Sequence, residues 1–236
     1  MELKAIKTDR LYVKVAGQLS RLISDGHLKP GERFPSEREL AERLGVSRPT
    51  IREAMIALEL SGLIEIRTGS GIYVLSAKPA RLQLRDRGVG PFQVLEARLL
   101  VEPEACALAA VRITEEQLLR LSAAYQAMEA EDKKGSVTEA ADWSFHGIIA
   151  EASQNSAVHE MVDWLWELRS RSELSTAFMS RIRDEGVRPA LEEHKAIVQA
   201  LVQRDPEAAR AAMREHLENA IKAAASHFGD VWPASS

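Results

Sequence analysis

The chain has 236 residues, of which 45% are hydrophobic and 28% are charged, and its formal net charge is −4. This is the composition of an ordinary soluble globular protein, and the length suits one large or two modest domains. No apolar run of about eighteen residues occurs, which excludes a transmembrane helix. The basic first residues are not followed by the apolar segment of a signal peptide, so none is expected.

Cys106 is the single cysteine and therefore cannot form an intramolecular disulfide. Its small apolar neighbours in VEPEACALAA indicate a buried structural thiol in a reducing, cytoplasmic setting. Charge is distributed unevenly along the chain. Residues 1–76 carry 12 Lys and Arg against 10 Asp and Glu, whereas residues 77–236 carry 19 against 25. The N-terminal part is therefore the one expected to contact phosphate.

The first 75 residues predict three helices followed by a β-hairpin. The first helix covers LYVKVAGQLSRLISDG, and the second begins at Ser36, a capping residue with Glu39 three positions later, and ends at Gly45. The third begins after Ser47. A short helix, the turn LGVS and a longer helix form the helix-turn-helix pattern. The alternating segment GLIEIRTGSGIYVL predicts a hairpin with a glycine-rich tip, which makes the motif winged.

The third helix has the features of a recognition helix. Arg48 and Arg52 lie one turn apart and are expected to project away from the apolar stripe of that helix. Arginine can bond guanine bidentately in the major groove, and the hydroxyls of Ser47 and Thr50 suit phosphate. A single arginine is usually a solvated surface residue. The shared register and the added wing favour DNA as the partner.

The segment LKPGERFPSERELAERLGVSRPTIREAMIALELSGLIEIRTGSGIYV resembles the winged helix-turn-helix of GntR-type bacterial transcription regulators, over residues 11–75. One departure is Pro49, which follows Arg48 where related sequences often have a residue with a backbone N–H. The resemblance implies double-stranded operator DNA as the partner. It also implies a set of DNA-contacting residues: Arg38, Ser47, Arg48, Thr50, Arg52 and Gly69.

Residues 76–91 combine prolines, glycines and basic residues without periodicity, and we interpret them as a linker. From Phe92 the pattern is helical, with breaks near residues 112–114, 134–136, 154–156, 185–186 and 204–206. Six helices of about 15 to 25 residues fit between the breaks. The predicted fold is therefore mainly α: a winged domain (1–75), a linker (76–91) and an all-α antiparallel bundle (92–230).

Four polar residues interrupt the apolar stripes of the predicted bundle. Asp142 and His146 lie one turn apart in ADWSFHGIIAE, while His194 and His216 are each central in the stripe of a later helix. Burying such groups costs several kcal/mol unless they find partners. Three helices that each donate inward predict a site for a divalent transition metal, namely Zn, Ni, Mn or Fe(II).

Two other interpretations of the cluster remain open. The site could activate water in a metal-dependent hydrolase, although no accompanying general-base motif is present and four protein ligands leave little room for a reaction. The polar residues could instead form a purely structural hydrogen-bonded cluster. His27, His159 and His227 are not central in a long apolar stripe, and we leave them out of the predicted site.

The region 92–228 resembles the FCD ligand-binding domain of FadR-type GntR regulators, an antiparallel bundle of six or seven helices. The resemblance implies a metal held by Asp142, His146, His194 and His216, and an effector carboxylate bound by Arg98 in VLEARLLVEPEACALAA. The segments GPFQVLEARLLVEPEAC and RTGSGIYVL most resemble regulators that respond to hexuronates and other sugar acids. The protein is then expected to be a cytoplasmic homodimeric repressor and not an enzyme.

Overall fold

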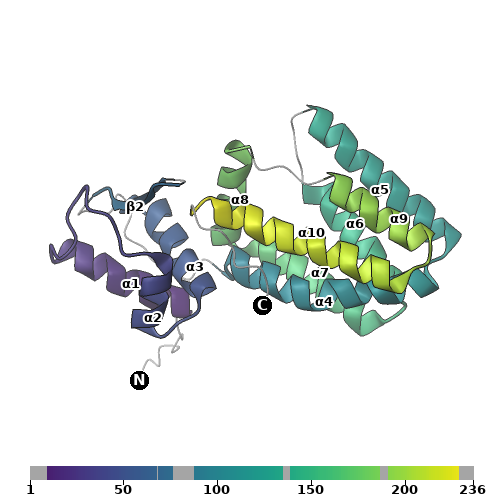
Figure 1. Ribbon diagram of the computed structural model, residues 1–236, viewed down its shortest axis with the longest axis horizontal. Coiled ribbons are helices and arrows are strands. Elements are labelled where there is room, and N and C mark those ends of the chain that lie inside the picture. The colour runs from purple at the N-terminus through teal and green to yellow at the C-terminus, as the bar shows by residue number, and fades with distance from the viewer. Residues whose placement is uncertain (1–9, 68, 77–87, 135–138, 187–190, 229–236) are drawn as a thin grey trace, which may run out of the picture. The chain divides into compact units, whose positions relative to one another are not determined.

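The computed structural model describes residues 10–67, 69–76, 88–134, 139–186 and 191–228 (Figure 1). Its described residues form ten helices and a two-stranded sheet, in agreement with the mainly α prediction. The chain divides into two compact units. The described part of the first covers 10–67, 69–76, 88–93, 172–178 and 225–228, and that of the second covers 94–134, 139–171, 179–186 and 191–224.

The winged helix-turn-helix has the predicted order of elements. Its elements are α1 (Leu11–Ser24), α2 (Glu37–Leu44), α3 (Arg48–Leu60), β1 (Ile64–Arg67) and β2 (Gly71–Val74). The strands pair antiparallel, with Ile64 opposite Val74. Ser36 caps α2 by accepting a hydrogen bond from the backbone N–H of Glu39, and Gly45 ends α2 in the left-handed conformation at φ 63°.

The apolar stripe of α3 forms the centre of this small core, and Ile51, Met55 and Leu58 have no exposed surface. Ser47 caps the helix by accepting from the backbone N–H of Thr50. Pro49 lies in the first turn, where a backbone N–H has no partner within the helix. The proline therefore removes a potential contact with phosphate without disrupting the helix.

Seven helices follow among the described residues, within the predicted range of six to seven. They are α4 (Pro91–Arg112), α5 (Glu115–Lys134), α6 (Glu139–Ala152), α7 (Ser156–Arg171), α8 (Glu173–Asp184), α9 (Leu191–Val202) and α10 (Pro206–Ser226). Cys106 is fully buried, as predicted for a structural thiol, in a core shared by α4, α5, α6, α9 and α10. No described helix has the length and apolarity needed to cross a membrane.

One helix boundary was not predicted. Ser172 separates α7 from α8, because its hydroxyl accepts a hydrogen bond from the backbone N–H of Ser175 at 3.1 Å. The same hydroxyl donates to the carbonyl of Val89 at 2.6 Å. In the sequence, Ser170, Ser172 and Ser175 lie close together, so no single serine stands out as the boundary. Most of the predicted linker, residues 77–87, lies outside the described residues.

Candidate functional site

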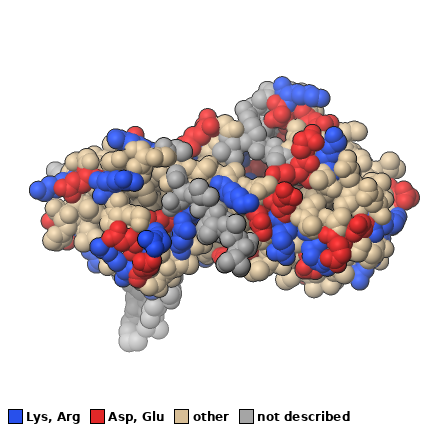
Figure 2. All heavy atoms as spheres, viewed as in Figure 1, with Lys and Arg blue, Asp and Glu red and all other residues tan. Residues whose placement is uncertain are grey.

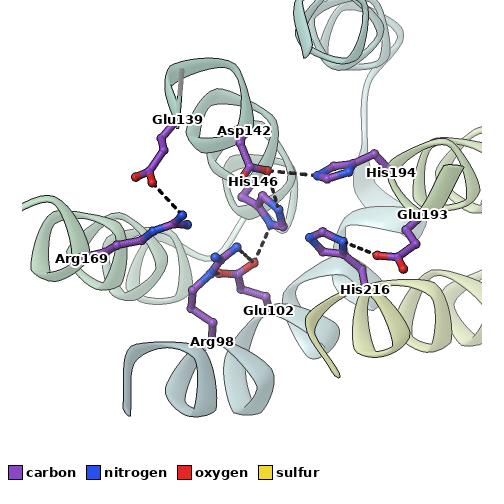
Figure 3. Close-up of polar contacts among 9 residues, drawn as sticks. All are labelled: Arg98, Glu102, Glu139, Asp142, His146, Arg169, Glu193, His194 and His216. Atoms are coloured by element: carbon purple, nitrogen blue, oxygen red, sulfur yellow. Dashed lines mark hydrogen bonds and ion pairs between the residues drawn. The ribbon is translucent and has the colours of Figure 1, made fainter. Parts of the chain in front are cut away.

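The four predicted metal ligands come together in the helical bundle (Figure 3). Asp142 and His146 lie on α6, His194 on α9 and His216 on α10, and one ligand atom from each lies within 4.8 Å of the others. Two ligands on opposite sides of one ion at about 2.1 Å are about 4.2 Å apart. The observed spacing is therefore close to what a single ion requires.

Apolar packing on each helix directs these polar side chains inward. Phe145 packs edge-on against the ring of His194, with centroids 5.0 Å apart, and has no exposed surface. Ile197 and Leu217 are also fully buried on the helices that carry His194 and His216. The three histidines are buried, whereas the side chain of Asp142 keeps 18% of its surface exposed.

Carboxylates hold the histidine rings of the cluster in place. Asp142 Oδ1 lies 3.0 Å from His194 Nε2 and 3.4 Å from His146 Nε2. The Nδ1 atom of His146 lies 2.6 Å from Glu102 Oε2, and that of His216 lies 3.0 Å from Glu193 Oε2. With Nδ1 of both rings facing a carboxylate, Nε2 is left as the ligand atom.

The ionisation of the two carboxylates nearest the cluster also suits a cation. Burial alone raises the pKa of Asp142, but hydrogen bonds from His146 and His194 outweigh it and hold this pKa well below its usual range. Burial likewise opposes ionisation of Glu102, yet Arg98 and His146 lower its pKa to about 2. The donor set of one carboxylate and three imidazoles fits a divalent transition metal.

Arg98, the predicted effector-binding residue, lies next to this cluster but is already paired. Its Nε and Nη2 atoms donate to Glu102 Oε1 at 2.6 Å and Oε2 at 3.3 Å. Its guanidinium lies 4.2 Å from the ring centroid of Trp166. Burial lowers the pKa of Arg98, but the charge of Glu102 outweighs burial and the net shift is upward. Arg98 is therefore charged, and the carboxylate of Glu102 lies between it and His146.

Sequence reasoning missed several charged residues around the cluster. Glu102 and Glu193 hold histidine rings, and Glu139 accepts from Arg169 at 2.9 Å (Figure 3). Glu139 also pairs with Arg183. Two signals were present in the sequence. Glu102 follows Arg98 by one helical turn, and Glu193 immediately precedes His194. Neither signal indicates which distant side chain the carboxylate contacts.

The histidines left out of the predicted site lie outside the metal cluster. The side chain of His159 is 38% exposed and pairs with Asp163 at 3.3 Å. His227 is buried, which its sequence context did not indicate, and its Nε2 lies 3.4 Å from Glu59.

The predicted DNA-contacting residues differ in their exposure. Arg38 is the most open, with 80% of its side chain exposed beside Glu42, and Arg48 keeps 30% exposed beside Glu37. Gly69 lies in the turn between the strands with φ 73°, a left-handed conformation that favours glycine. Ser47 is occupied as the cap of α3, where its Oγ lies 2.9 Å from that of the buried Thr50.

Arg52 does not project outward as the sequence suggested. Its side chain has no exposed surface, and its Nε lies 2.7 Å from Glu37 Oε1. Its guanidinium lies 5.0 Å from the ring centroid of Phe92, within the same compact unit. The reason is that α3 is covered on every side at this level, because Thr50–Leu58 are all buried. Helical periodicity predicts which way a side chain points from its own helix axis. It cannot show whether other elements of the fold cover that side chain.

Basic side chains do not merge into one continuous patch on the face shown in Figure 2, where acidic side chains are interspersed with them. The weak charge asymmetry along the sequence is therefore not accompanied by a uniformly basic surface on this face. Contacts with DNA would depend on individual residues such as Arg38 and Arg48.

Comparison with known proteins identifies both regions of the chain. Residues 11–74 match the family described as bacterial regulatory proteins, gntR family, and residues 93–219 match the FCD domain. The chain is 38% identical to the Uxu operon transcriptional regulator of Escherichia coli K12, over 96% of this chain and 91% of that protein. It is 35% identical to the Exu regulon transcriptional regulator of the same strain, over 89% and 83%.

Two further proteins are less similar in sequence but are also matched over most of their length. The HTH-type transcriptional regulator LutR of Bacillus subtilis is 32% identical, over 88% of this chain and 98% of that protein. A solved structure of Streptococcus agalactiae GntR has 30% identity and a TM-score of 0.47, and covers 89% of this chain and 98% of its own. The matched family and the relatives found by sequence are transcriptional regulators and not enzymes, so the hydrolase interpretation is set aside. The chain belongs to the gntR family of bacterial transcriptional regulators, with a winged helix-turn-helix and an FCD domain.

Proposed function

We propose that this regulator is a cytoplasmic repressor whose binding to operator DNA is controlled by a small carboxylate, of the hexuronate or sugar-acid class. The observation that carries the proposal is the convergence of Asp142, His146, His194 and His216 within 4.8 Å, beside the charged Arg98. Relatives named for the Uxu operon and the Exu regulon support a sugar acid as the effector class.

The residues of the cluster suit this role. Asp142 and the three histidines would hold a divalent transition metal, and a metal with four such ligands accepts one or two more oxygens in an octahedral shell. A carboxylate together with a neighbouring hydroxyl supplies two oxygens at that spacing. Arg98 carries the positive charge that would offset the acid, and a guanidinium binds a carboxylate with directional hydrogen bonds.

The regulator is proposed to act as a homodimer, because helix-turn-helix proteins read two half-sites of an operator. Exposed apolar side chains occur on two neighbouring helices, α4 and α7, and Val101 of α4 packs against the cluster that Val162 and Trp166 of α7 form with Ala150. On α4 these are Leu100 at 75% and Val111 at 56% exposure, and on α7 they are Met161 at 45% and Trp164 at 58%. A second copy of the chain is the proposed occupant of this face.

The direct test is an operator gel shift with the metal-loaded protein, titrated with D-galacturonate and D-glucuronate. The expected result is loss of the shifted complex with at least one hexuronate, and no loss once the metal has been removed by a chelator. A protein that carries no metal and binds no acid would leave the third interpretation, a purely structural polar cluster.

A further inference from the structure

We propose that Glu102 restricts the effector to acids that carry only one carboxylate. It does so as the fixed counter-ion of Arg98, and it is also the positioning residue of the predicted metal ligand His146. This inference rests on the proposed function and adds an effector class to it. It predicts that Glu102→Gln has two effects of opposite sign. The variant weakens metal binding and strengthens acid binding, more so for a diacid than for a monoacid.

The two oxygens of Glu102 serve two different partners. Oε1 accepts from Arg98 Nε at 2.6 Å, and Oε2 lies 2.6 Å from His146 Nδ1 and 3.3 Å from Arg98 Nη2. Among the described residues, Glu102 is the only hydrogen-bond acceptor recorded for Arg98 (Figure 3). Both side chains are nearly fully buried, at 3% exposure each, so solvent screens the pair weakly.

The first consequence concerns the metal. A carboxylate that accepts from Nδ1–H of a ligating histidine fixes its tautomer and raises its basicity. Glutamine has one acceptor oxygen and one N–H₂ group, whereas Arg98 and His146 both need an acceptor. Glu102→Gln keeps an acceptor at only one of the two positions that face Arg98 Nε and His146 Nδ1, and His146 loses its anionic partner. Loss of such a partner typically weakens metal affinity about 10- to 100-fold.

The second consequence concerns the acid. Arg98 has five N–H groups, and Glu102 occupies two of them while cancelling its charge at short range. An incoming carboxylate therefore shares Arg98 with a resident anion that also repels it. One unit charge a few ångströms away in a poorly solvated site changes affinity by roughly tenfold or more. Removal of the Glu102 charge should therefore favour anions.

A count of fixed charges gives the same preference. With a divalent metal, the charges of Arg98, Glu102 and Asp142 leave the site at +1. A monocarboxylate neutralises a charge of +1, whereas a dicarboxylate leaves the buried site negative, which is costly. The site as built suits a uronic acid and disfavours the corresponding aldaric acid.

Glu193 provides a matched control on the opposite side of the cluster. It accepts from His216 at 3.0 Å and from Asn219 at 2.7 Å, so it holds a ligand histidine as Glu102 does. No contact between Glu193 and Arg98 is recorded, and its side chain is 24% exposed. Glu193→Gln should weaken metal binding but leave the choice between acids unchanged once metal is saturating.

The experiment is calorimetry on wild type, Glu102→Gln and Glu193→Gln. Zn²⁺ is titrated first into the apo-proteins. D-galacturonate and D-galactarate, which differ by one carboxylate, are then titrated at saturating Zn²⁺. Wild type should prefer galacturonate, and both variants should lose at least tenfold in Zn²⁺ affinity. Only Glu102→Gln should bind both acids more tightly, with at least a tenfold larger gain for galactarate.

Unchanged Zn²⁺ affinity in Glu102→Gln would overturn the positioning role, and unchanged or weaker acid binding would overturn the counter-ion role. A wild type that binds neither acid at saturating Zn²⁺ overturns the proposed function. The inference then fails as well unless Glu102→Gln binds galactarate.

If Glu102→Gln shows no cooperative thermal transition, Glu102→Asp replaces it. Aspartate keeps the negative charge but has a shorter side chain, so Glu102→Asp should retain the wild-type acid preference and still lose Zn²⁺ affinity. An unchanged Zn²⁺ affinity or a relaxed acid preference in this variant would overturn the inference.

Discussion

His194 and His216 face each other across the candidate metal site, with ring centroids 4.3 Å apart and planes inclined at 61°. Burial lowers the pKa of His216 to about 4, and the neighbouring charges of His194 and His146 act in the same direction. The His216 imidazole is therefore neutral at pH 7, which is the form that binds metals. Two imidazoles that face each other beside the carboxylate of Asp142 are arranged to bind one shared cation.

Replacing both facing histidines should abolish metal binding. Wild type purified after growth with Zn, Ni and Mn should carry close to one transition metal per chain, and His194→Ala with His216→Ala should carry none by elemental analysis. The stabilisation that metal gives to thermal unfolding should disappear with it. His159→Ala, at an exposed histidine outside the cluster, is the control and should keep its metal. A metal-free wild type would refute the site.

Arg48→Ala and Arg52→Ala should have different effects, although the two residues lie one turn apart on α3. Arg48 is partly exposed, and its loss should weaken operator binding by about 1–3 kcal/mol with little change in melting temperature. Arg52 is buried against Glu37, so its loss should destabilise the winged domain by about 3–5 kcal/mol. Gel shifts and thermal unfolding separate the two outcomes. Identical effects in both assays would contradict the burial of Arg52.

Arg98→Ala should separate effector response from DNA binding. The variant should bind operator close to wild type and fail to respond to the acid, because the lost guanidinium lies in the helical domain, where it pairs with Glu102, and not in the winged domain. Coupling between two sites is typically about 1–3 kcal/mol and acts equally in both directions. Calorimetry of the acid with wild type should therefore give different affinities with and without operator. Equal affinities would show that the acid does not regulate DNA binding.

Trp164→Glu should convert the proposed dimer to monomers. A charge placed on the apolar face of α4 and α7 would lie unpaired in the proposed interface. Sedimentation velocity should show half the wild-type mass at micromolar concentration. Leu119→Glu changes an equally apolar residue that is 73% exposed on α5, and should leave the mass unchanged. A dimeric Trp164→Glu protein would place the interface elsewhere.

Cys106 should be unreactive in the native protein. Burial raises the pKa of its thiol, and the nearby charge of Glu102 adds to this effect, so almost no thiolate forms at pH 8. Ellman's reagent should label no thiol in the folded protein and one thiol per chain in guanidinium chloride. Rapid labelling of the folded protein would mean that the core around α4 opens readily.

The sequence predicted that these four polar side chains would converge, because each interrupts an apolar stripe whose helical period is easy to follow. Asp142 and His146 share a face by their spacing alone, and His194 and His216 lie between residues that must be buried. The fold followed from the same periodicity together with capping residues such as Ser36. These are local signals, readable without knowledge of the partner helix.

Residues that depend on a distant partner could not be predicted in this way. In sequence, Arg98 and Glu102 have the spacing of an ordinary exposed ion pair on a helix. Only the fold brings His146, from α6, against Glu102 and buries both. The prediction that Arg52 projects outward was wrong for the same reason, since Glu37 and Phe92 contact a side chain that the periodicity of α3 places on the exposed face.

Leu100 stands between Arg98 and Glu102 on a single turn of α4, and its side chain is exposed whereas theirs are buried. The same turn therefore carries residues of the proposed acid site on one side and part of the proposed dimer face on the other. In a dimer built on that face, displacement of this turn in one subunit alters the surface on which the other packs. The two acid sites would then be thermodynamically linked. Titration of the dimer should depart from a single-site isotherm, so the regulator would respond to a change in acid concentration with a Hill coefficient different from one.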